Sequence, residues 1–259
     1  MSVPSETVNE RPHQAYGIDI GGSGIKGAMV DTSTGTLLTD RTRIATPQPS
    51  TPKAVAKVVA ELSQKAGNPA LIGATFPAII QHGVARSAAN VDQSWIDTDV
   101  DKICTQATQG EVYVLNDADA AGLAEVRFGA AKGVPGVVIV LTFGTGIGSG
   151  LFLDGQLVPN TELGHLEIDG KDAESRAAAS VKDKQKMSYK EWAKRVNHYL
   201  RAVEKLFTPD LFVLGGGVSK DSDKWLPELK VSTPMRVAQL LNNAGIVGAA
   251  LAAVERHAE

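Results

Sequence analysis

The sequence predicts an α/β protein in which two similar α/β domains flank a cleft. Three observations favour this fold class. Apolar strand-like runs alternate with amphipathic helix-like runs, a strand–glycine turn–strand pattern occurs twice, and 259 residues suffice for two domains of ordinary size. Hydrophobic residues make up 43% of the chain and charged residues 21%, as is typical of a soluble globular protein.

Composition also excludes several classes of protein. The formal net charge of −3 gives no sign of a nucleic-acid partner. Cys104 is the single cysteine, so neither an internal disulfide nor a cysteine cluster for zinc is possible, which fits a reducing compartment. The polar first fourteen residues do not resemble a signal peptide, and no apolar run approaches the roughly 20 residues of a membrane span. We therefore expect a cytoplasmic protein with no membrane partner.

The first half of the chain reads as a β-meander followed by helices and buried strands. Short turn signals separate the strand-like runs, and Pro52 and Gly67 bracket the first helix-like run. Strands are expected at 15–20, 25–31, 37–46, 71–76 and 112–117, and helices at 52–66 and 117–129.

The opening pattern then returns at residues 137–158. Sliding residues 18–31 onto 141–154 without a gap brings four pairs into register. The pairs are Asp19 with Thr142, Gly21 with Gly144, Gly27 with Gly150, and Asp31 with Asp154. Such a match favours internal duplication and predicts one glycine hairpin on each side of a cleft.

The last third of the chain contributes two helices and one buried strand. Residues 188–207 place their apolar side chains on one helical face, and Ser188 with Glu191 forms a capping box. A buried strand follows within 211–220 and runs into three glycines, and a helix is expected over 244–258. We predict a smaller domain of residues 1–116 plus about 245–259, and a larger domain of residues 117–244.

Three glycine-rich segments follow apolar strands: GGSGIKG, GTGIGSG and GGG. Any one of them alone is explained equally well by a tight turn. Together, the exposed amides of two hairpins suggest a site that holds phosphate from two sides. Lys26 could balance phosphate charge or be a solvated turn lysine. Asp19 could hold Mg²⁺ through water or cap the turn.

Polar residues at two further positions are candidates for chemistry. Asn116 and Asp117 end one strand and open a helix, where either would serve as an ordinary N-cap, and Asp119 adds a third polar group. A carboxylate at that edge could instead accept the proton of an attacking hydroxyl. Glu162 and His165 in ELGH are either structural partners or ligands for sugar hydroxyls.

A basic segment stands out in this acidic chain. Residues 181–205 hold eight basic residues against three acidic ones, a local net charge of +5. A solvent-exposed helix face accounts for most of it, but such a stripe could also attract a long polyanion. The candidates for a polyphosphate track are Lys182, Lys186, Lys190 and Lys194.

These motifs together resemble one family. DIGGSGIKG, NDADAA, LTFGTGIGSG, ELGH and LGGGVS are similar to the ROK-type sugar kinases, from about Gly17 to the C-terminus. The resemblance implies the actin-like (ribonuclease H-like) ATPase fold. SAANVDQSWID and the missing zinc motif resemble the polyphosphate glucokinase branch, which includes polyphosphate/ATP glucomannokinases.

The resemblance also implies roles for individual residues. Asp117 would be the base that activates the sugar 6-hydroxyl. The implied sugar ligands are Asn90, Asn116, Glu162, His165 and Glu174. The phosphate and nucleotide site would comprise Asp19, Gly21, Gly22, Ser23, Gly24, Lys26, Thr142, Gly144, Thr145, Gly146, Gly215, Gly216 and Gly217. Where ROK kinases commonly carry a zinc-binding cysteine motif, this chain has KDAESRAAAS, so no structural zinc is expected and packing must hold the local shape.

We therefore expect a kinase that makes glucose 6-phosphate, and also mannose 6-phosphate, from inorganic polyphosphate and ATP with Mg²⁺, as a monomer or homodimer. The alternatives are an ATP-only glucokinase, a sugar-responsive ROK regulator and a chaperone-like or filament ATPase. A regulator is disfavoured because about fifteen residues precede the first strand, too few for a DNA-binding helix-turn-helix. Sugar preference, donor preference and oligomeric state stay open.

Overall fold

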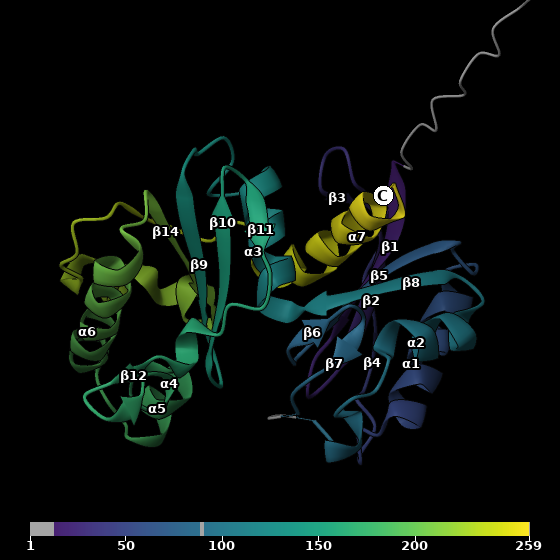
Figure 1. Ribbon diagram of the computed structural model, residues 1–259, viewed down its shortest axis with the longest axis horizontal. Helices are drawn as coiled ribbons and strands as arrows, with labels where there is room; N and C mark the ends of the chain where they lie inside the picture. The colour runs from purple at the N-terminus through teal and green to yellow at the C-terminus, as the bar shows by residue number, and fades with distance from the viewer. Residues whose placement is uncertain (1–12, 89–90, 259) are drawn as a thin grey trace, which may run out of the picture.

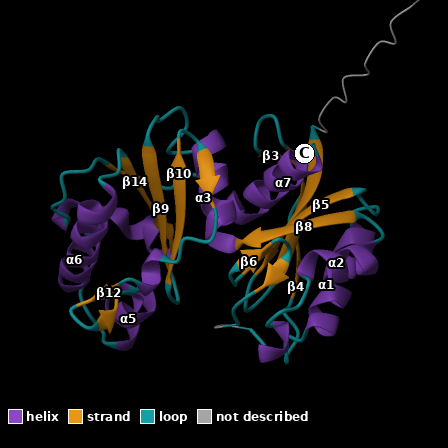
Figure 2. Cartoon of the chain, in the orientation of Figure 1, coloured by secondary structure: helices purple, strands orange, loops and turns teal. Residues whose placement is uncertain are grey.

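The computed structural model describes residues 13–88 and 91–258, and two β-sheets lie on either side of a central pair of helices (Figure 1). Figure 2 shows the same arrangement by secondary structure, with strands gathered into the two sheets and helices packed on their faces. Each sheet is therefore covered on both sides, and the central helices are shared between them.

The first sheet is built from the N-terminal meander and two buried parallel strands. Its order is β3-β2-β1-β5-β8, and β4 also pairs with β2. Strand β1 is antiparallel to β2 and parallel to β5, and β5 is parallel to β8. The bounds are β1 Gln14–Ile20, β2 Ile25–Asp31, β3 Thr36–Leu37, β4 Thr42–Ile44, β5 Leu71–Phe76 and β8 Glu111–Asn116.

Two helices cover one face of this sheet and a third covers the other. Helices α1 (Pro52–Lys65) and α2 (Val100–Thr108) pack on the side chains of β1 and β5 that point to one face. The opposite face packs against α7 (Ala244–His257). All six residues of β5 are buried, as expected for a central parallel strand covered on both faces. A short hairpin, β6 (Ile80–Gln81) and β7 (Val84–Ala85), follows β5.

The second sheet repeats this plan. Its order is β11-β10-β9-β14-β15, with β9 antiparallel to β10 and parallel to β14. Helix α6 (Tyr189–Phe207) covers one face and α3 (Asp117–Phe128) the other, because alternate residues of β9 point to opposite sides. The strands are β9 Val137–Phe143, β10 Ile147–Leu153, β11 Gln156–Val158, β14 Leu211–Gly216 and β15 Met235–Val237.

Helices α3 and α7 pack against each other between the two sheets (Figure 1). Glycines make the contact close. A Cβ on Gly248 of α7 would lie 1.8 Å from the carbonyl oxygen of Ala120 in α3. In the same way, a Cβ on Gly73 of β5 would lie 1.8 Å from the carbonyl oxygen of Ala249. Backbone thus meets backbone on both sides of α7, which leaves no room for a side chain at these positions.

The longer predicted elements are confirmed. The capping box of Ser188 and Glu191 is present at the start of α6, and the helices at 52–66, 117–129 and 244–258 appear within two residues of the expected bounds. The single strand expected at 37–46 is wrong. The chain forms β3 and β4 instead, because the segment turns between them and pairs with two separate stretches of β2.

The gapless match between the two glycine hairpins is wrong beyond the turn. Ile20 pairs with Ile25 in the first hairpin, whereas Phe143 pairs with Ile147 in the second. The first turn therefore holds four residues and the second holds three. By strand pairing, Gly27 corresponds to Ser149 and not to Gly150.

Several short elements have no counterpart among the expected ones. They include α2, β12 (Glu167–Ile168), β13 (Lys171–Asp172), α4 (Glu174–Ala177) and α5 (Ala179–Lys184). Over residues 13–88 and 91–258, no helix has the length and apolar character that crossing a bilayer requires. The division into domains at residue 116 stays a prediction.

The close approach at Gly73 gives a stability prediction. Gly73→Ala should destabilise the protein by about 1–3 kcal/mol, because the new methyl group must push α7 away from β5. Gly22→Ala is the matched control, since a Cβ there meets no atom within 4 Å. Thermal unfolding midpoints of both variants test this, and equal midpoints would contradict the packing described.

Candidate active site

A cavity of about 640 Å³ opens between the turns of the two glycine hairpins. Residues from both halves of the chain line it. Twelve predicted site residues are among them: Gly21, Gly22, Asn116, Asp117, Thr142, Gly144, Thr145, Gly146, Glu162, His165, Glu174 and Gly216. The fold thus brings together candidates separated by almost 200 positions in the sequence.

Asp117 is the first residue of α3 and lines this cavity. Strand β8 ends at Asn116, so the carboxylate lies at the junction between a parallel strand and a helix. Its side chain is exposed at the cavity surface, where the surrounding protein desolvates the carboxylate. This desolvation raises the pKa of Asp117 from 3.8 to about 6, and the nearby charges of Asp19 and Glu162 add to the shift. A carboxylate with such a pKa is suited to accept a proton near neutral pH.

Asn116 has a structural role in the wall of the cavity. Its Oδ1 accepts hydrogen bonds from the backbone N–H groups of Ala118 and Asp119, at 2.8 and 3.2 Å, and so caps α3. Its Nδ2 donates to the carbonyl oxygen of Ala78 at 3.1 Å. The capping interpretation of Asn116 is therefore confirmed, and one amide hydrogen remains for a ligand.

Glu162 and His165 stand on the side of the cavity formed by the second half of the chain. Burial is the main cause that raises the pKa of Glu162. His165 Nδ1 lies 2.8 Å from Asp172 Oδ2, and this hydrogen bond is the main cause that raises the pKa of His165. The pair therefore offers a polar ligand both a hydrogen-bond acceptor and a donor held in place.

Asp172 also orders the segment that precedes Glu174. Its Oδ1 accepts the backbone N–H of Glu174 at 3.1 Å, and its carbonyl oxygen accepts the Ser175 hydroxyl at 2.6 Å. Packing was expected to hold this shape, and hydrogen bonds to the carboxylate and to the carbonyl oxygen of Asp172 contribute as well. Ligand atoms of His165, Asp172 and Glu174 lie within 4.8 Å of one another. The absence of a structural zinc stays a prediction.

Glu174 joins the side of the cavity that holds Glu162 and His165 to the second glycine turn. Its Oε2 accepts the backbone N–H of Ile147 at 3.0 Å. A Cβ at Gly146 would lie 2.2 Å from the same oxygen, so any side chain there would displace the Glu174 carboxylate. By contrast, a Cβ on Gly144 meets no atom within 4 Å. Gly146 thus leaves room for the Glu174 carboxylate, and Gly144 leaves room in the cavity.

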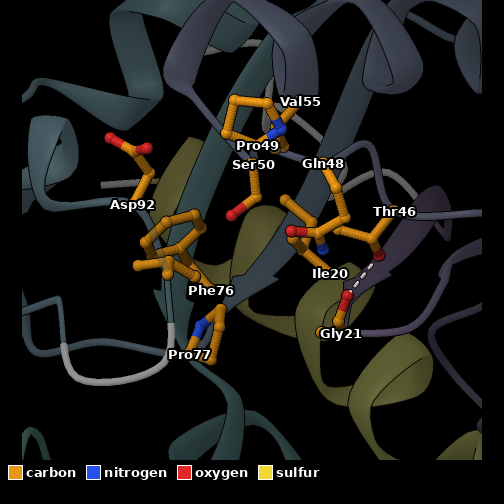
Figure 3. Close-up of a pocket in the computed structure, with 12 residues that line it drawn as sticks. Ile20, Gly21, Thr46, Gln48, Pro49, Ser50, Val55, Phe76, Pro77 and Asp92 are labelled. Carbon is orange, nitrogen blue, oxygen red and sulfur yellow. Dashed lines mark hydrogen bonds between the residues drawn. The ribbon is translucent and has the colours of Figure 1, made fainter.

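Two polar side chains donate hydrogen bonds to the backbone of the first glycine turn. The Thr46 hydroxyl donates to the carbonyl oxygen of Gly21, and Arg43 donates to the carbonyl oxygen of Ser23 at 2.8 Å. Figure 3 shows the Thr46 contact in a side pocket of about 200 Å³, whose walls include Phe76 and Asp92. Because Gly21 lines both the pocket and the main cavity, the two adjoin at this turn.

Asp19 is the second-last residue of β1 and stands shortly before this turn. Its Oδ1 accepts the Thr75 hydroxyl at 3.1 Å, and its Oδ2 lies 3.4 Å from Lys26 Nζ. The lysine thus faces the carboxylate as an ion pair. The Asp19 carboxylate keeps free lone pairs that could bind a hydrated divalent cation. Its oxygen ligands therefore fit the predicted Mg²⁺.

Not all predicted site residues reach the main cavity. Asp19, Ser23, Gly24, Lys26 and Gly215 are not among its lining residues. Gly217 lines a second cavity of about 460 Å³, which shares Gly144 and Thr145 with the first. Asn90 lies outside the described residues.

The four candidate lysines do not converge. Lys182 lines the second cavity, where its Nζ lies 4.5 Å from the ring centroid of Tyr189 and 2.7 Å from Asp183 Oδ1. Lys194 lines a separate small pocket on α6, and Lys186 and Lys190 are exposed. Lys182 therefore stands nearest the glycine turn, and the proposed track has no single groove that holds all four.

Sequence reasoning missed several lining or supporting residues. Asp172 supports His165, and Ala78, Ile79 and Ser87 line the cavity. Asp172 sits two positions before Glu174, so its place in KDAE was the available signal. Ser87 opens the motif SAANVDQSWID, but no site role was assigned to it, whereas Ala78 and Ile79 belong to no motif.

Comparison with known proteins agrees with this geometry. Residues 15–180 match the ROK family. The chain is 54% identical over 253 residues to the polyphosphate glucokinase of Mycobacterium leprae (strain TN), covering 97% of this chain and 78% of that protein. The polyphosphate glucokinase of Mycobacterium tuberculosis (strain ATCC 25618 / H37Rv) is 55% identical over 240 residues, covering 92% of this chain and 91% of that protein.

A solved structure shows the same fold. The inorganic polyphosphate/ATP-glucomannokinase from Arthrobacter sp. strain KM superposes with a TM-score of 0.88 at 52% identity, covering 95% of this chain and all of that chain. From the family match, the two glucokinase relatives and this structure together, the chain belongs to the ROK family and has its actin-like ATPase fold.

Proposed function

We propose that this chain transfers a phosphoryl group from inorganic polyphosphate, and from ATP, to the 6-hydroxyl of glucose, with Asp117 as the general base. The observation that carries this proposal is the position of Asp117. Its carboxylate opens into a cavity bordered by two glycine turns and by Glu162, His165 and Glu174. The names of the relatives, polyphosphate glucokinase and polyphosphate/ATP-glucomannokinase, support the choice of substrates.

The arrangement divides the cavity into an acceptor side and a donor side. Glu162, His165 and Glu174 would hold sugar hydroxyls, so that the 6-hydroxyl points to Asp117. The amides of the turns at 21–24 and 144–146 would hold the transferring phosphoryl group. Catalysis would then consist of positioning, proton removal by Asp117 and stabilisation of charge on the phosphoryl oxygens.

Asp19 is the proposed holder of Mg²⁺, through water. Bound there, the ion would supply positive charge to the phosphoryl group. Lys26 would share this role, since its ammonium group already faces Asp19. Gly216 and Gly217 would border the nucleotide base, because a Cβ on Gly217 meets no atom within 4 Å in the adjoining cavity.

A polyphosphate chain would leave the main cavity through the second one. The two cavities share Gly144 and Thr145, and Lys182 and Lys220 line the outer part. We propose that Lys182 makes the first contact with the polyanion, with Lys186, Lys190 and Lys194 further out. We also propose use of mannose, because the Arthrobacter structure is that of a glucomannokinase, and a cytoplasmic location, because the single cysteine fits a reducing compartment.

Initial rates of sugar 6-phosphate formation test the proposal. Glucose and mannose should each be crossed with polyphosphate and ATP in the presence of Mg²⁺. We expect glucose 6-phosphate from both donors. Activity with ATP alone would favour the ATP-only glucokinase, and no sugar phosphorylation with either donor would contradict the kinase assignment and favour a regulator.

The raised pKa of Asp117 predicts the acid side of the pH profile. The base must be ionised, so kcat/KM for glucose should fall tenfold per pH unit below about pH 6. Asp117→Asn should lower kcat by roughly 10²- to 10⁴-fold, because an amide does not take up the proton. Rates from pH 4.5 to 8 measure both effects, with Asp154→Asn as a surface control. A variant that keeps more than a tenth of wild-type kcat would exclude Asp117 as the base.

Lys182 gives a prediction about donor choice. Lys182→Ala should raise KM for polyphosphate roughly tenfold and KM for ATP less. The physical reason is that polyphosphate carries charge along its whole length, whereas the base and ribose of ATP are uncharged. Lys184→Ala, at an exposed lysine of the same helix, is the control. Equal effects on both donors would remove Lys182 from the polyphosphate track.

A further inference from the structure

A pair of hydrogen bonds crosses from one half of the chain to the other beside the proposed sugar site. Asn160 Oδ1 accepts the backbone N–H of Ile80 at 2.8 Å. Asn160 Nδ2 donates to the carbonyl oxygen of Ile80 at 2.7 Å. The side chain thus pairs with one residue of β6 as a neighbouring strand would, and it joins the loop after β11 to the β6–β7 hairpin.

The backbone of Asn160 is anchored separately. Its N–H donates to Asp119 Oδ2 at 2.8 Å, and Asp119 is a residue of α3 that is only 1% exposed. Asn160 has φ of 58°, in the left-handed region that asparagine and glycine tolerate best. Residue type, backbone conformation and both sets of hydrogen bonds therefore agree in fixing the amide group of Asn160 against Ile80.

Both ends of this connection lead into the cavity. Ala78, Ile79 and Ser87 of the hairpin segment line one wall. Glu162 and His165 follow Asn160 by two and five residues and line the facing wall. The loop between them is tied down as well, because Ser149 Oγ accepts the N–H of Leu163 at 2.9 Å. A displacement of Asn160 relative to Ile80 would change the spacing of the two walls.

The local energetics argue against a purely stabilising role. Asp119 Oδ1 is buried and has no hydrogen-bond partner among the described residues. A buried carboxyl group with an unpartnered oxygen costs stability, and an alanine there would avoid that cost. Buried polar groups without hydrogen-bond partners are concentrated at functional sites, where a fixed geometry is needed.

We propose that Asn160, anchored by Asp119, is a positioning residue that sets the distance between the hairpin wall and Glu162, and thereby the fit of the sugar. This inference rests on the proposed glucose kinase activity and adds to it a residue that does not line the cavity itself. Its consequence is selective: the sugar should lose affinity when the connection is cut, whereas the phosphoryl donor should not.

Asn160→Gly is the sharpest test. Glycine accepts the left-handed backbone and keeps the N–H to Asp119, so only the side-chain bonds to Ile80 are lost. We expect KM for glucose to rise about tenfold. KM for polyphosphate and kcat should each change less than about threefold. Asn68→Gly is the matched control, because Asn68 is exposed and also has a positive φ, of 55°. An unchanged KM for glucose, or equal rises for both substrates, would overturn the proposal.

Asp119→Ala tests the anchor. It removes the acceptor for the Asn160 N–H and should raise KM for glucose in the same direction, by about fivefold. If the two residues act as one unit, the double variant should raise KM no more than the larger single effect. Multiplying effects would show that Asp119 and Asn160 act independently and would overturn the anchoring part.

Hydrogen exchange keeps this test separate from the proposed function. The Ile80 amide should exchange at least about tenfold faster in Asn160→Gly than in the wild type, with no substrate present. Unchanged exchange would show that the hydrogen bond is not formed and would overturn the proposal. If exchange changes but wild-type protein does not phosphorylate glucose, the proposed function fails and the positioning role fails with it, while the connection itself stands.

Discussion

The packing of α7 against α3 is the contact on which the active site depends. Gly248 lets the backbone of α7 rest on Ala120 of α3, and Gly73 lets the backbone of β5 rest on the other side of α7. Because α3 begins at Asp117, this stack of backbone on backbone determines where the proposed base stands relative to the first sheet. The other face of α3 packs on the second sheet, so one helix places the carboxylate with respect to both glycine turns.

The cavity holds acidic groups where the proposed anionic donor would also bind. Burial raises the pKa of Asp117 and of Glu162, and the charges of Glu162 and of Asp19, which does not line the cavity, raise the pKa of Asp117 further. The positive charges that oppose them are local: Lys26 at Asp19 and His165 beside Asp172. The charge distribution of the site therefore suits an anionic ligand that binds together with a cation, or one whose charge is stabilised by several backbone amides.

Much of the fold and about two thirds of the candidate lining residues follow from the sequence, because strong local signals mark them. Prolines, caps and apolar periodicity locate α1, α3, α6 and α7, and glycine turns locate the phosphate side. The difference in length between the two turns, four residues against three, was not predicted. A gapless alignment matches glycines but contains no information on which strand residues pair. Asn160 and Ile80 escaped for another reason: their contact joins positions 80 residues apart, and neither belongs to a motif.

Glu174 carries a consequence of its own. One carboxylate faces the proposed sugar and also accepts the amide of Ile147 at the edge of the phosphate turn. On the proposed function, sugar would bind to this carboxylate and the donor to the turn that it holds, so their binding energies would be coupled. Thermodynamic linkage requires the effect to be reciprocal, so whatever factor glucose applies to the affinity of the donor, the donor applies to that of glucose. In an enzyme whose alternative acceptor is water, such heterotropic coupling would keep the donor weakly held until the sugar is in place.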